Sequence, residues 1–325
     1  MVGYQRNDSM TANQKLIAGC VSGVMTRFIT QPLDVIKVRT QLQKKALSEN
    51  ERRKWFRTTR MILKEEGIAA LWHGHNVGQI HSILAVSSQF YAYELSTKYT
   101  ADTFGDSKFR PFLQFLCGIF AGCCSATLVL PLDVIRVRQM IVKEQYPSII
   151  KGAREVYATG GILAFYQGLN ASLLQMGPAV GISFGIFNLV QTLILSLLSE
   201  CRDEKCKRAS GNVHKPENLL LASTVAGSIS GFISKTLTYP FDLVKRRMQI
   251  STHKADVRFQ VPSTSKDLAS CTGLAKCFVQ LYKVEGLKGL YRGFKVTIYK
   301  AQLTSVVAFT TYELFCYAIR EVKAR

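Results

Sequence analysis

Long apolar stretches alternate with polar ones along the chain. Four of them carry few charges, are rich in Gly, Ala, Ser and Thr, and cover 16–36, 112–135, 173–198 and 219–244. Two weaker stretches, 77–95 and 296–318, complete three pairs. Because an α-helix rises about 1.5 Å per residue, about 20 residues can cross a hydrocarbon core of about 30 Å. The pattern predicts an all-α membrane protein with six transmembrane helices.

A short motif repeats three times in register with these pairs. It reads PLDVIK at 32–37, PLDVIR at 131–136 and PFDLVK at 240–245, so that its prolines are 99 and 109 residues apart. Further on, each copy has two glycines seven residues apart, with an aromatic residue two positions before the second. Such periodicity indicates a chain built from similar units. We place these units at 1–107, 108–213 and 214–325.

A polar, basic loop of variable length joins the proline motif to the first of these glycines. Its length is 35, 30 and 46 residues in the three copies, which is typical of a surface segment. The positions five and four residues before the glycine are apolar in every copy: Ile62 and Leu63, Val156 and Tyr157, Leu281 and Tyr282. With charged neighbours, each pair predicts a short helix on the membrane surface.

The alternative to a membrane protein is a soluble array of helices in which Gly and Pro only end helices. Helix-solenoid repeats are shorter, about 30 to 50 residues. The apolar stretches also contain Gly-xxx-Gly, at Gly19 and Gly23, Gly118 and Gly122, and Gly227 and Gly231. Small residues that let helix backbones approach closely are the expected interface in lipid. Prolines inside such spans predict three bent helices.

Charge and motifs narrow the class of function. The formal net charge of +20, from 42 bases and 22 acids, suggests a nucleic-acid partner at first, but the bases are spread over loops on one side of the predicted spans. The five histidines lack any metalloprotease or triad context, and the nine cysteines lack zinc spacing, so we interpret the thiols as reduced. We expect no enzyme activity, cofactor, metal or nucleic acid. Residues 1–12 lack an apolar core, so targeting is expected to lie in the mature chain.

The three motif copies with their downstream glycines resemble the mitochondrial carrier family, over essentially the whole chain. The resemblance implies a pseudo-threefold barrel of six tilted helices in the inner mitochondrial membrane, with short surface helices on the matrix side. It also implies termini in the intermembrane space, exchange of solutes by alternating access, and contacts with membrane lipids such as cardiolipin. Three positions depart from the family pattern: His73 and Gln167 replace a base, and Gly160 replaces an acid.

The resemblance implies that motif acids and bases of neighbouring copies form a closed ring. The implied pairs are Asp34 with Arg136, Asp133 with Lys245, and Asp242 with Lys37. Charges at membrane depth must be matched or face water. Gln41 and Gln249, four residues after the motif base, could brace two of the pairs, whereas the second copy has Met140 there. We expect the ring to form a gate on the matrix side.

A second gate is expected at the cytoplasmic side, where the family often has an aromatic residue, an acid and a base. The residues assigned to it are Tyr93, Glu94, Asn188, Tyr312 and Glu313. The position of the base is taken by Thr97, Gln191 and Cys316, so we expect this gate to close by hydrogen bonds and packing. The alternative is that these are ordinary polar residues at helix ends.

A substrate site is expected between the gates. Arg27 and Lys235 stand five residues before a motif proline and seven before the motif acid, so each lies on the same helical face as that acid. We expect both to be unpaired bases that face a cavity. His81, Gln175 and Lys300 stand seven residues after the second glycine, at the level where the family contacts substrate. The three bases could gather a polyanion such as a diphosphate, and the other two could recognise a heterocycle. The alternative for each base is a side chain that snorkels along lipid.

Within the family, the chain is similar to members that carry thiamine pyrophosphate. The residues that carry this similarity lie at 1–4, 233–240 and 300–301. It implies import of thiamine pyrophosphate into the matrix in exchange for nucleotides. Two alternatives remain open: a carrier of nucleotides or coenzyme A with the same bases, and, from another class, a non-transporting membrane scaffold or proton leak pathway.

Overall fold

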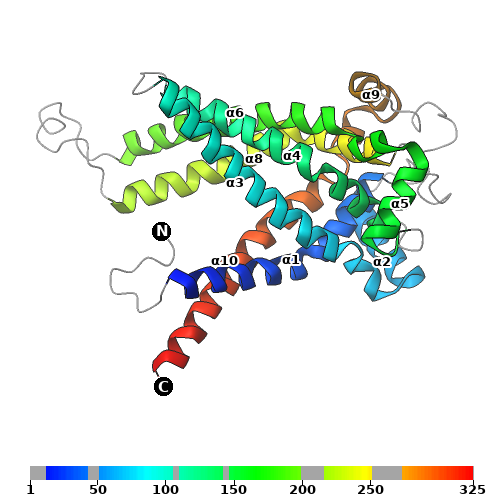
Figure 1. The fold of residues 1–325 in the computed structure, drawn as a ribbon, viewed down its shortest axis with the longest axis horizontal. Coiled ribbons are helices and arrows are strands. Elements are labelled where there is room, and N and C mark those ends of the chain that lie inside the picture. The colour runs from blue at the N-terminus through cyan, green and yellow to red at the C-terminus, as the bar shows by residue number, and fades with distance from the viewer. Residues whose placement is uncertain are drawn as a thin grey trace, which may run out of the picture.

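The fold is six long helices and several short ones, seen in a computed structural model that describes residues 12–42, 51–104, 110–141, 146–198, 216–250 and 273–324 (Figure 1). The long helices are α1 (Ala12–Leu42), α3 (His75–Phe104), α4 (Arg110–Ile141), α6 (Leu169–Leu198), α8 (Pro216–Gln249) and α10 (Phe294–Ala324). The short helices are α2 (Glu51–Glu65), η1 (Ile68–Trp72), α5 (Ile149–Gly160), η2 (Ile162–Tyr166) and α9 (Leu274–Leu290). All six predicted spans and all three predicted surface helices are therefore confirmed.

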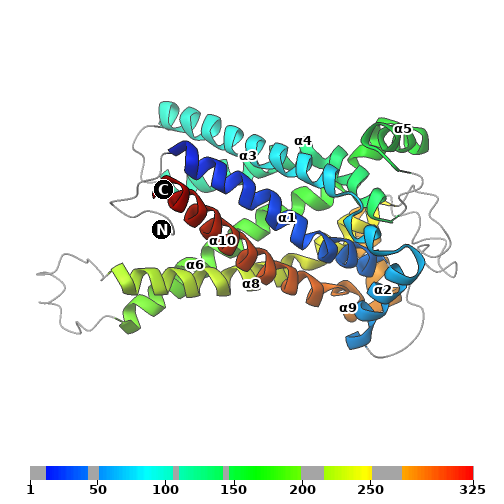
Figure 2. The same cartoon turned by 90° about the horizontal axis from the view of Figure 1, so that it is seen from below.

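Neighbouring repeats pack against each other through helix pairs. The pairs are α1 with α10, α3 with α4, and α6 with α8, so the last helix of one repeat lies beside the first helix of the next. Helices α2, α5 and α9 lie at one end of the bundle, which we call the motif end because the three motifs lie there (Figures 1 and 2). The start of α1 and the end of α10 lie at the opposite end of the bundle, which we call the terminal end.

Apolar side chains cover much of the outside of the long helices. Phe90 and Tyr91 are both 70% exposed and Leu197 is 77% exposed, which is costly in water but suits hydrocarbon. By length and hydropathy alone, two segments of the described chain could cross a membrane, 112–141 and 162–197. The helices α1, α3, α8 and α10 are as long, with 30 to 34 residues, and α1, α8 and α10 carry more charges than these two segments. Many of those charges are paired inside the bundle, as described below.

Each surface helix is attached by the first of its two apolar positions. Ile62, Val156 and Leu281 are buried to 1% or less, in three separate core clusters. The following residues point outward: Leu63 is 41%, Tyr157 is 60% and Tyr282 is 52% exposed. The surface helices therefore keep one apolar side in the protein and offer the other to a membrane surface.

The expectation that the Gly-xxx-Gly glycines form the helix interfaces needs correction. An added Cβ at Gly19, Gly23, Gly118 or Gly231 would meet nothing within 4 Å, so these glycines do not bring helix backbones together in this conformation. Small hydroxyls join the helix pairs instead. They donate to a backbone carbonyl across each interface, from Ser22 to Ala308, Ser125 to Ala85 and Ser234 to Ala179, at 2.9, 2.8 and 2.7 Å. The motif prolines do lie inside continuous helices, α1, α4 and α8.

The expectation that the cysteines are reduced is wrong at one position. Cys277 of α9 is disulfide-bonded, whereas Cys20, Cys117, Cys123, Cys124 and Cys316 are free thiols.

The two glycines that follow the motif in each repeat, which we call the motif glycines, connect the repeats at the motif end: Gly67 and Gly74, Gly161 and Gly168, and Gly286 and Gly293. All six of them have positive φ, from 64° to 84°, where L side chains are strained. A Cβ on Gly74 or Gly168 would lie 3.1 Å from the backbone oxygen of Arg136 or Lys245, the motif base of the next repeat. A Cβ on Gly293 would lie 3.7 Å from the oxygen of Lys37, which closes the cycle.

We predict that Gly168→Ala lowers the free energy of unfolding by about 1 to 3 kcal/mol, the usual cost of a strained backbone position. Its φ of 84° and the nearby Lys245 carbonyl leave little room for relaxation. Thermal unfolding of the purified protein measures the effect. Gly231→Ala is the control, because that glycine is helical and open, and alanine there favours the helix by up to about 1 kcal/mol. A Gly168→Ala protein that melts at or above the wild-type temperature would contradict the packing described here.

Candidate functional site

Three ion pairs close the motif end of the bundle. Arg136 Nη2 lies 3.0 Å from Asp34 Oδ2, Lys245 Nζ lies 3.0 Å from Asp133 Oδ2, and Lys37 Nζ lies 2.8 Å from Asp242 Oδ2. The acids are at most 13% exposed. Each pair joins two of the helices α1, α4 and α8, and together they link all three repeats. The pairing order is the one that the resemblance implies, while a gating role stays a prediction.

Each of the three carboxylates also has a second cation. Lys300 Nζ of α10 lies 2.5 Å from Asp34 Oδ1, and Lys235 Nζ of α8 lies 3.6 Å from Asp242 Oδ2. Arg246 Nη1 lies 2.9 and 3.1 Å from the two oxygens of Asp133. Six bases thus surround three acids, which leaves a formal excess of three positive charges at one level of the bundle. Such an excess favours binding of an anion.

The expectation that Lys235 stands unpaired in a cavity is wrong for this conformation. The Cα atom of Lys235 lies two helical turns from Asp242, but the lysine side chain is long enough for its ammonium group to reach that carboxylate. The seven-residue spacing correctly predicted a shared face. It does not define where the ammonium group points.

Arg246 is a site residue that the sequence reasoning missed. It follows the motif base in the third copy, where the first two copies have the buried valines Val38 and Val137. That substitution within an otherwise regular repeat was a usable signal. The guanidinium also donates to Gln249 Oε1 at 3.0 Å, so Asp133 lies in the most densely bonded of the three pairs.

Only one of the two expected glutamine braces forms. Gln249 Nε2 donates to Asp133 Oδ2 at 3.0 Å, as predicted. Gln41 Nε2 instead donates to the hydroxyl of Tyr239 at 3.0 Å, and that hydroxyl donates to the Arg292 carbonyl at 2.6 Å. The pair of Asp34 and Arg136 is braced by Gln31, whose Oε1 accepts from Arg136 Nη2 at 3.2 Å. Gln31 stands directly before the motif proline.

Gly78 contacts two arginines near the ring. Arg27 Nη1 donates to the Gly78 carbonyl at 3.3 Å. A Cβ on Gly78 would lie 2.8 Å from Arg136 Nε, so the Arg136 guanidinium lies against the bare backbone. The corresponding positions beside the shorter lysine bases are Ser172 and Thr297. A glycine in this one copy therefore matches the only arginine among the three motif bases.

His81 and Gln175, the two neutral residues expected to contact the substrate, have different surroundings. His81 Nδ1 of α3 is buried and has no hydrogen-bond partner among the described residues. A buried nitrogen without a partner is costly, so a ligand group that bonds it would be favoured. Gln175 is half-buried on α6, and in the described chain it has no hydrogen bond or ion pair with the other candidate residues. The structure thus brings Lys300 to Asp34 and Arg27 to the Gly78 carbonyl, near Arg136 of the ring, and leaves Gln175 apart from them.

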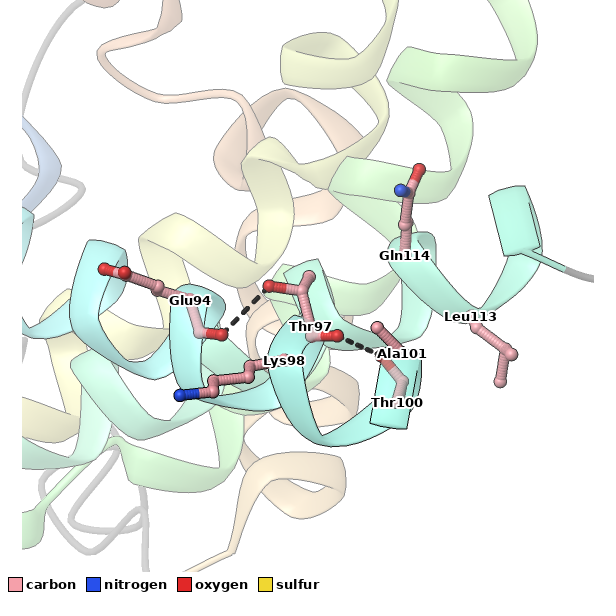
Figure 3. A pocket seen from close by; sticks show the side chains of 7 residues that line it. All are labelled: Glu94, Thr97, Lys98, Thr100, Ala101, Leu113 and Gln114. Carbon is pink, nitrogen blue, oxygen red and sulfur yellow. Dashed lines mark hydrogen bonds between the residues drawn. The ribbon is translucent and has the colours of Figure 1, made fainter. Parts of the chain in front are cut away.

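The residues assigned to the cytoplasmic gate lie toward the terminal end. Tyr93, Glu94, Asn188 and Glu313 are exposed, and neither of these acids makes an ion pair within the described ranges. Glu94 lines a pocket of about 350 Å³ between α3 and α4, together with Thr97, Lys98, Thr100, Ala101, Leu113 and Gln114 (Figure 3). The Thr97 hydroxyl donates to the backbone oxygen of Glu94 at 3.0 Å, and this bond is drawn in Figure 3. Tyr312 packs beside Ala18 and Cys316 between α1 and α10.

A second set of arginines ties the motif end to the surface helices. Arg39 bonds both oxygens of Glu66, and Arg247 bonds those of Glu285 at 2.6 and 3.0 Å. In the second copy, where Gly160 replaces the acid, Arg138 donates to Thr159 Oγ1 at 3.1 Å and to Gln167 Oε1 at 3.3 Å.

Two of the three departures from the family pattern therefore compensate each other, since Gln167 accepts a bond where an acid is missing. Tyr146 also lies beside Arg138, and burial raises the pKa of its phenol, which keeps that group neutral.

Comparisons with known proteins agree with this architecture. The family model described as "Mitochondrial carrier protein" matches three times, over residues 8–103, 107–197 and 217–321. The chain is 35% identical over 330 residues to the mitochondrial thiamine pyrophosphate carrier of Bos taurus, which covers 97% of this chain and 96% of the relative. It is 32% identical to the human protein of the same name, with the same coverage. It is 29% identical to the mitochondrial thiamine pyrophosphate carrier 1 of Saccharomyces cerevisiae, with 97% of each chain covered.

The charge ring makes a testable prediction about Asp133. Asp133→Lys should lower the free energy of unfolding by about 3 to 5 kcal/mol, because it leaves buried like charges. Adding Lys245→Asp should restore only part of the loss, since Arg246 still faces the new lysine. A triple variant with Arg246→Val, the residue type of the other two copies, should recover more.

Thermal unfolding of the single, double and triple variants measures this ordering. The effect of Arg246→Val in the wild-type background is the control for loss of packing. If the double variant is already as stable as the triple, Arg246 does not share Asp133 with Lys245.

Proposed function

The chain belongs to the mitochondrial carrier family, and we propose that it imports thiamine pyrophosphate into the mitochondrial matrix in exchange for nucleotides. The protein lies in the inner membrane, with the motif end toward the matrix and both termini in the intermembrane space. The observation that carries this proposal is the excess of cations around Asp34, Asp133 and Asp242. The names of relatives that match over 97% of the chain support the choice of substrate.

The excess charge suits a diphosphate ester. Unmatched charges inside a membrane require water or a counter-ion, and a polyanion entering from the terminal end provides one. Lys235 and Lys300 are 40% and 30% exposed, more than the other bases of the ring, so they are the cations that such a ligand meets. Arg27, two turns above Asp34 on α1, can add a bidentate contact to phosphate oxygens.

The heterocyclic part of the substrate would lie toward His81 and Gln175. The buried Nδ1 of His81 can exchange its missing hydrogen bond for one to a ring nitrogen or amino group. Gln175 offers both a donor and an acceptor. A site with bases on one side and neutral polar groups on the other distinguishes the two ends of thiamine pyrophosphate.

The ion-pair ring is the matrix gate in this proposal. It is formed here, while Glu94 and Glu313 at the other end make no ion pair within the described part of the chain. A substrate shifts such an equilibrium only through different affinity for the two states. The empty carrier therefore rests closed toward the matrix and open toward the intermembrane space.

Membrane lipids are the remaining partners. The exposed apolar residues of α2, α5 and α9 lie beside bases such as Arg60, Lys64 and Lys283. Apolar and basic side chains together favour an anionic lipid surface, including cardiolipin.

A carrier of nucleotides or coenzyme A is the second candidate. The same three bases would hold their phosphates, and only the contacts of His81 and Gln175 separate the substrates. A scaffold or a proton leak pathway is disfavoured, because neither needs a ring of matched charges beside an excess of bases.

We predict that Lys300→Ala and Arg27→Ala each reduce exchange of thiamine pyrophosphate at least tenfold, because a charge-assisted contact contributes about 1.5 to 3 kcal/mol. Uptake of labelled substrate into liposomes that contain the purified protein measures the rate. Lys295→Ala is the control, since that lysine is exposed on the same helix. Wild-type rates in both variants would contradict the site, and liposomes that take up nucleotides but no thiamine pyrophosphate would contradict the proposed substrate.

A further inference from the structure

Two of the three gate carboxylates share their charge with a proposed substrate lysine. Lys300 contacts Asp34, and Lys235 contacts Asp242. Asp133 differs, because its second cation is Arg246, which follows the motif on the matrix side of α8. Arg246 is 16% and Lys245 is 17% exposed, less than half of the 40% of Lys235. The ring therefore has two ion pairs within reach of a ligand that arrives from the terminal end and one out of reach.

The reach of each lysine follows from its place on the helix. Lys235 stands seven residues before Asp242, which is about 10 Å of helix rise toward the terminal end. Its amino group extends back toward the ring, where Nζ lies 3.6 Å from Asp242 Oδ2. An anion that enters from the terminal end meets this ammonium before it meets the ring. Arg246 stands four residues beyond Asp242, on the opposite side of that carboxylate along α8.

We propose that the substrate diphosphate and the gate carboxylates Asp34 and Asp242 compete for Lys300 and Lys235, so that substrate binding weakens two of the three ion pairs of the matrix gate. This inference rests on the proposed function, since it assigns the same two lysines to the substrate. When the diphosphate takes them, Asp34 keeps only Arg136 and Asp242 keeps only Lys37. The pair of Asp133 with Lys245 and Arg246 is unaffected.

The competition makes opening of the gate asymmetric. Both weakened pairs end on α1, because Asp34 and Lys37 both belong to that helix. The retained pair joins α4 to α8. Substrate binding thus leaves α1 joined to each of its two neighbours in the ring by a single ion pair, while the second and third repeats keep both of their contacts at Asp133. The substrate favours the opened gate because it binds Lys300 and Lys235 more tightly once Asp34 and Asp242 have moved away from these lysines and no longer compete for them.

The test compares three substitutions that each remove one gate carboxylate. Asp34→Asn and Asp242→Asn free a substrate lysine, so both should bind inorganic pyrophosphate and thiamine pyrophosphate roughly five- to tenfold more tightly than wild type. Asp133→Asn adds the same charge and breaks the same kind of pair, but frees no substrate lysine, so binding should tighten much less. Calorimetric titration of the purified full-length protein gives the three affinities.

A second measurement keeps the proposal testable if one variant does not fold. In a Lys300→Gln background, Asp34→Asn should no longer tighten binding, while Asp242→Asn should still do so. Equal tightening by all three substitutions would overturn the proposal, because a general charge effect would then explain it. So would tightening by Asp34→Asn that persists without Lys300.

Failure of the proposed function gives a different result. If the wild-type protein binds pyrophosphate but neither binds nor transports thiamine pyrophosphate, the substrate is wrong, and the pyrophosphate series still decides whether the lysines are shared. If wild type binds and transports thiamine pyrophosphate and the three substitutions act alike, the function stands and the competition is excluded.

Discussion

The ring of three carboxylates inside the bundle is the interaction on which the rest of the structure depends. Ionised groups at membrane depth need partners, and here every partner in the three central pairs comes from another repeat. The ring therefore fixes the order of the repeats and closes one end of the bundle at the same time. The positive-φ glycines reinforce this arrangement, because Gly74, Gly168 and Gly293 each approach the backbone of the base that enters the ring from the next repeat.

The sequence predicts the parts of this structure that follow from spacing. Apolar length and the threefold motif locate the six long helices and the three surface helices, and the resemblance gives the pairing order. Side-chain reach is different, because residue intervals do not determine it. Lys235 was expected to be unpaired and instead reaches Asp242, and Gln41 was expected to brace an ion pair and instead bonds Tyr239. Arg246 was missed although Val38 and Val137 at the matching positions mark it as an exception.

These departures from threefold symmetry carry the functional argument. A symmetric ring would explain closure but not selection of a substrate, whereas this ring has lysines from the terminal side at two carboxylates and an arginine from the other side at the third. In the proposed function, the excess of cations binds an anionic substrate when one is present and pairs with the gate carboxylates when none is. Under that proposal substrate recognition and gating involve the same charges, and α1, the helix that takes part in both shared pairs, is the element expected to move.

Distances between the three surface helices test this account most directly. Lys64, Ala158 and Lys283 stand three residues before the first motif glycine in their copies and are exposed, so spin labels there can report the matrix end by pulsed electron resonance. Without substrate, each pair of labels should give one main distance, in agreement with a closed ring. Saturating thiamine pyrophosphate should add a longer distance to both pairs that include position 64 and change the pair at 158 and 283 least. Distributions that stay unchanged with a transported substrate, or that lengthen equally at all three pairs, would contradict a ring opened through its two shared lysines.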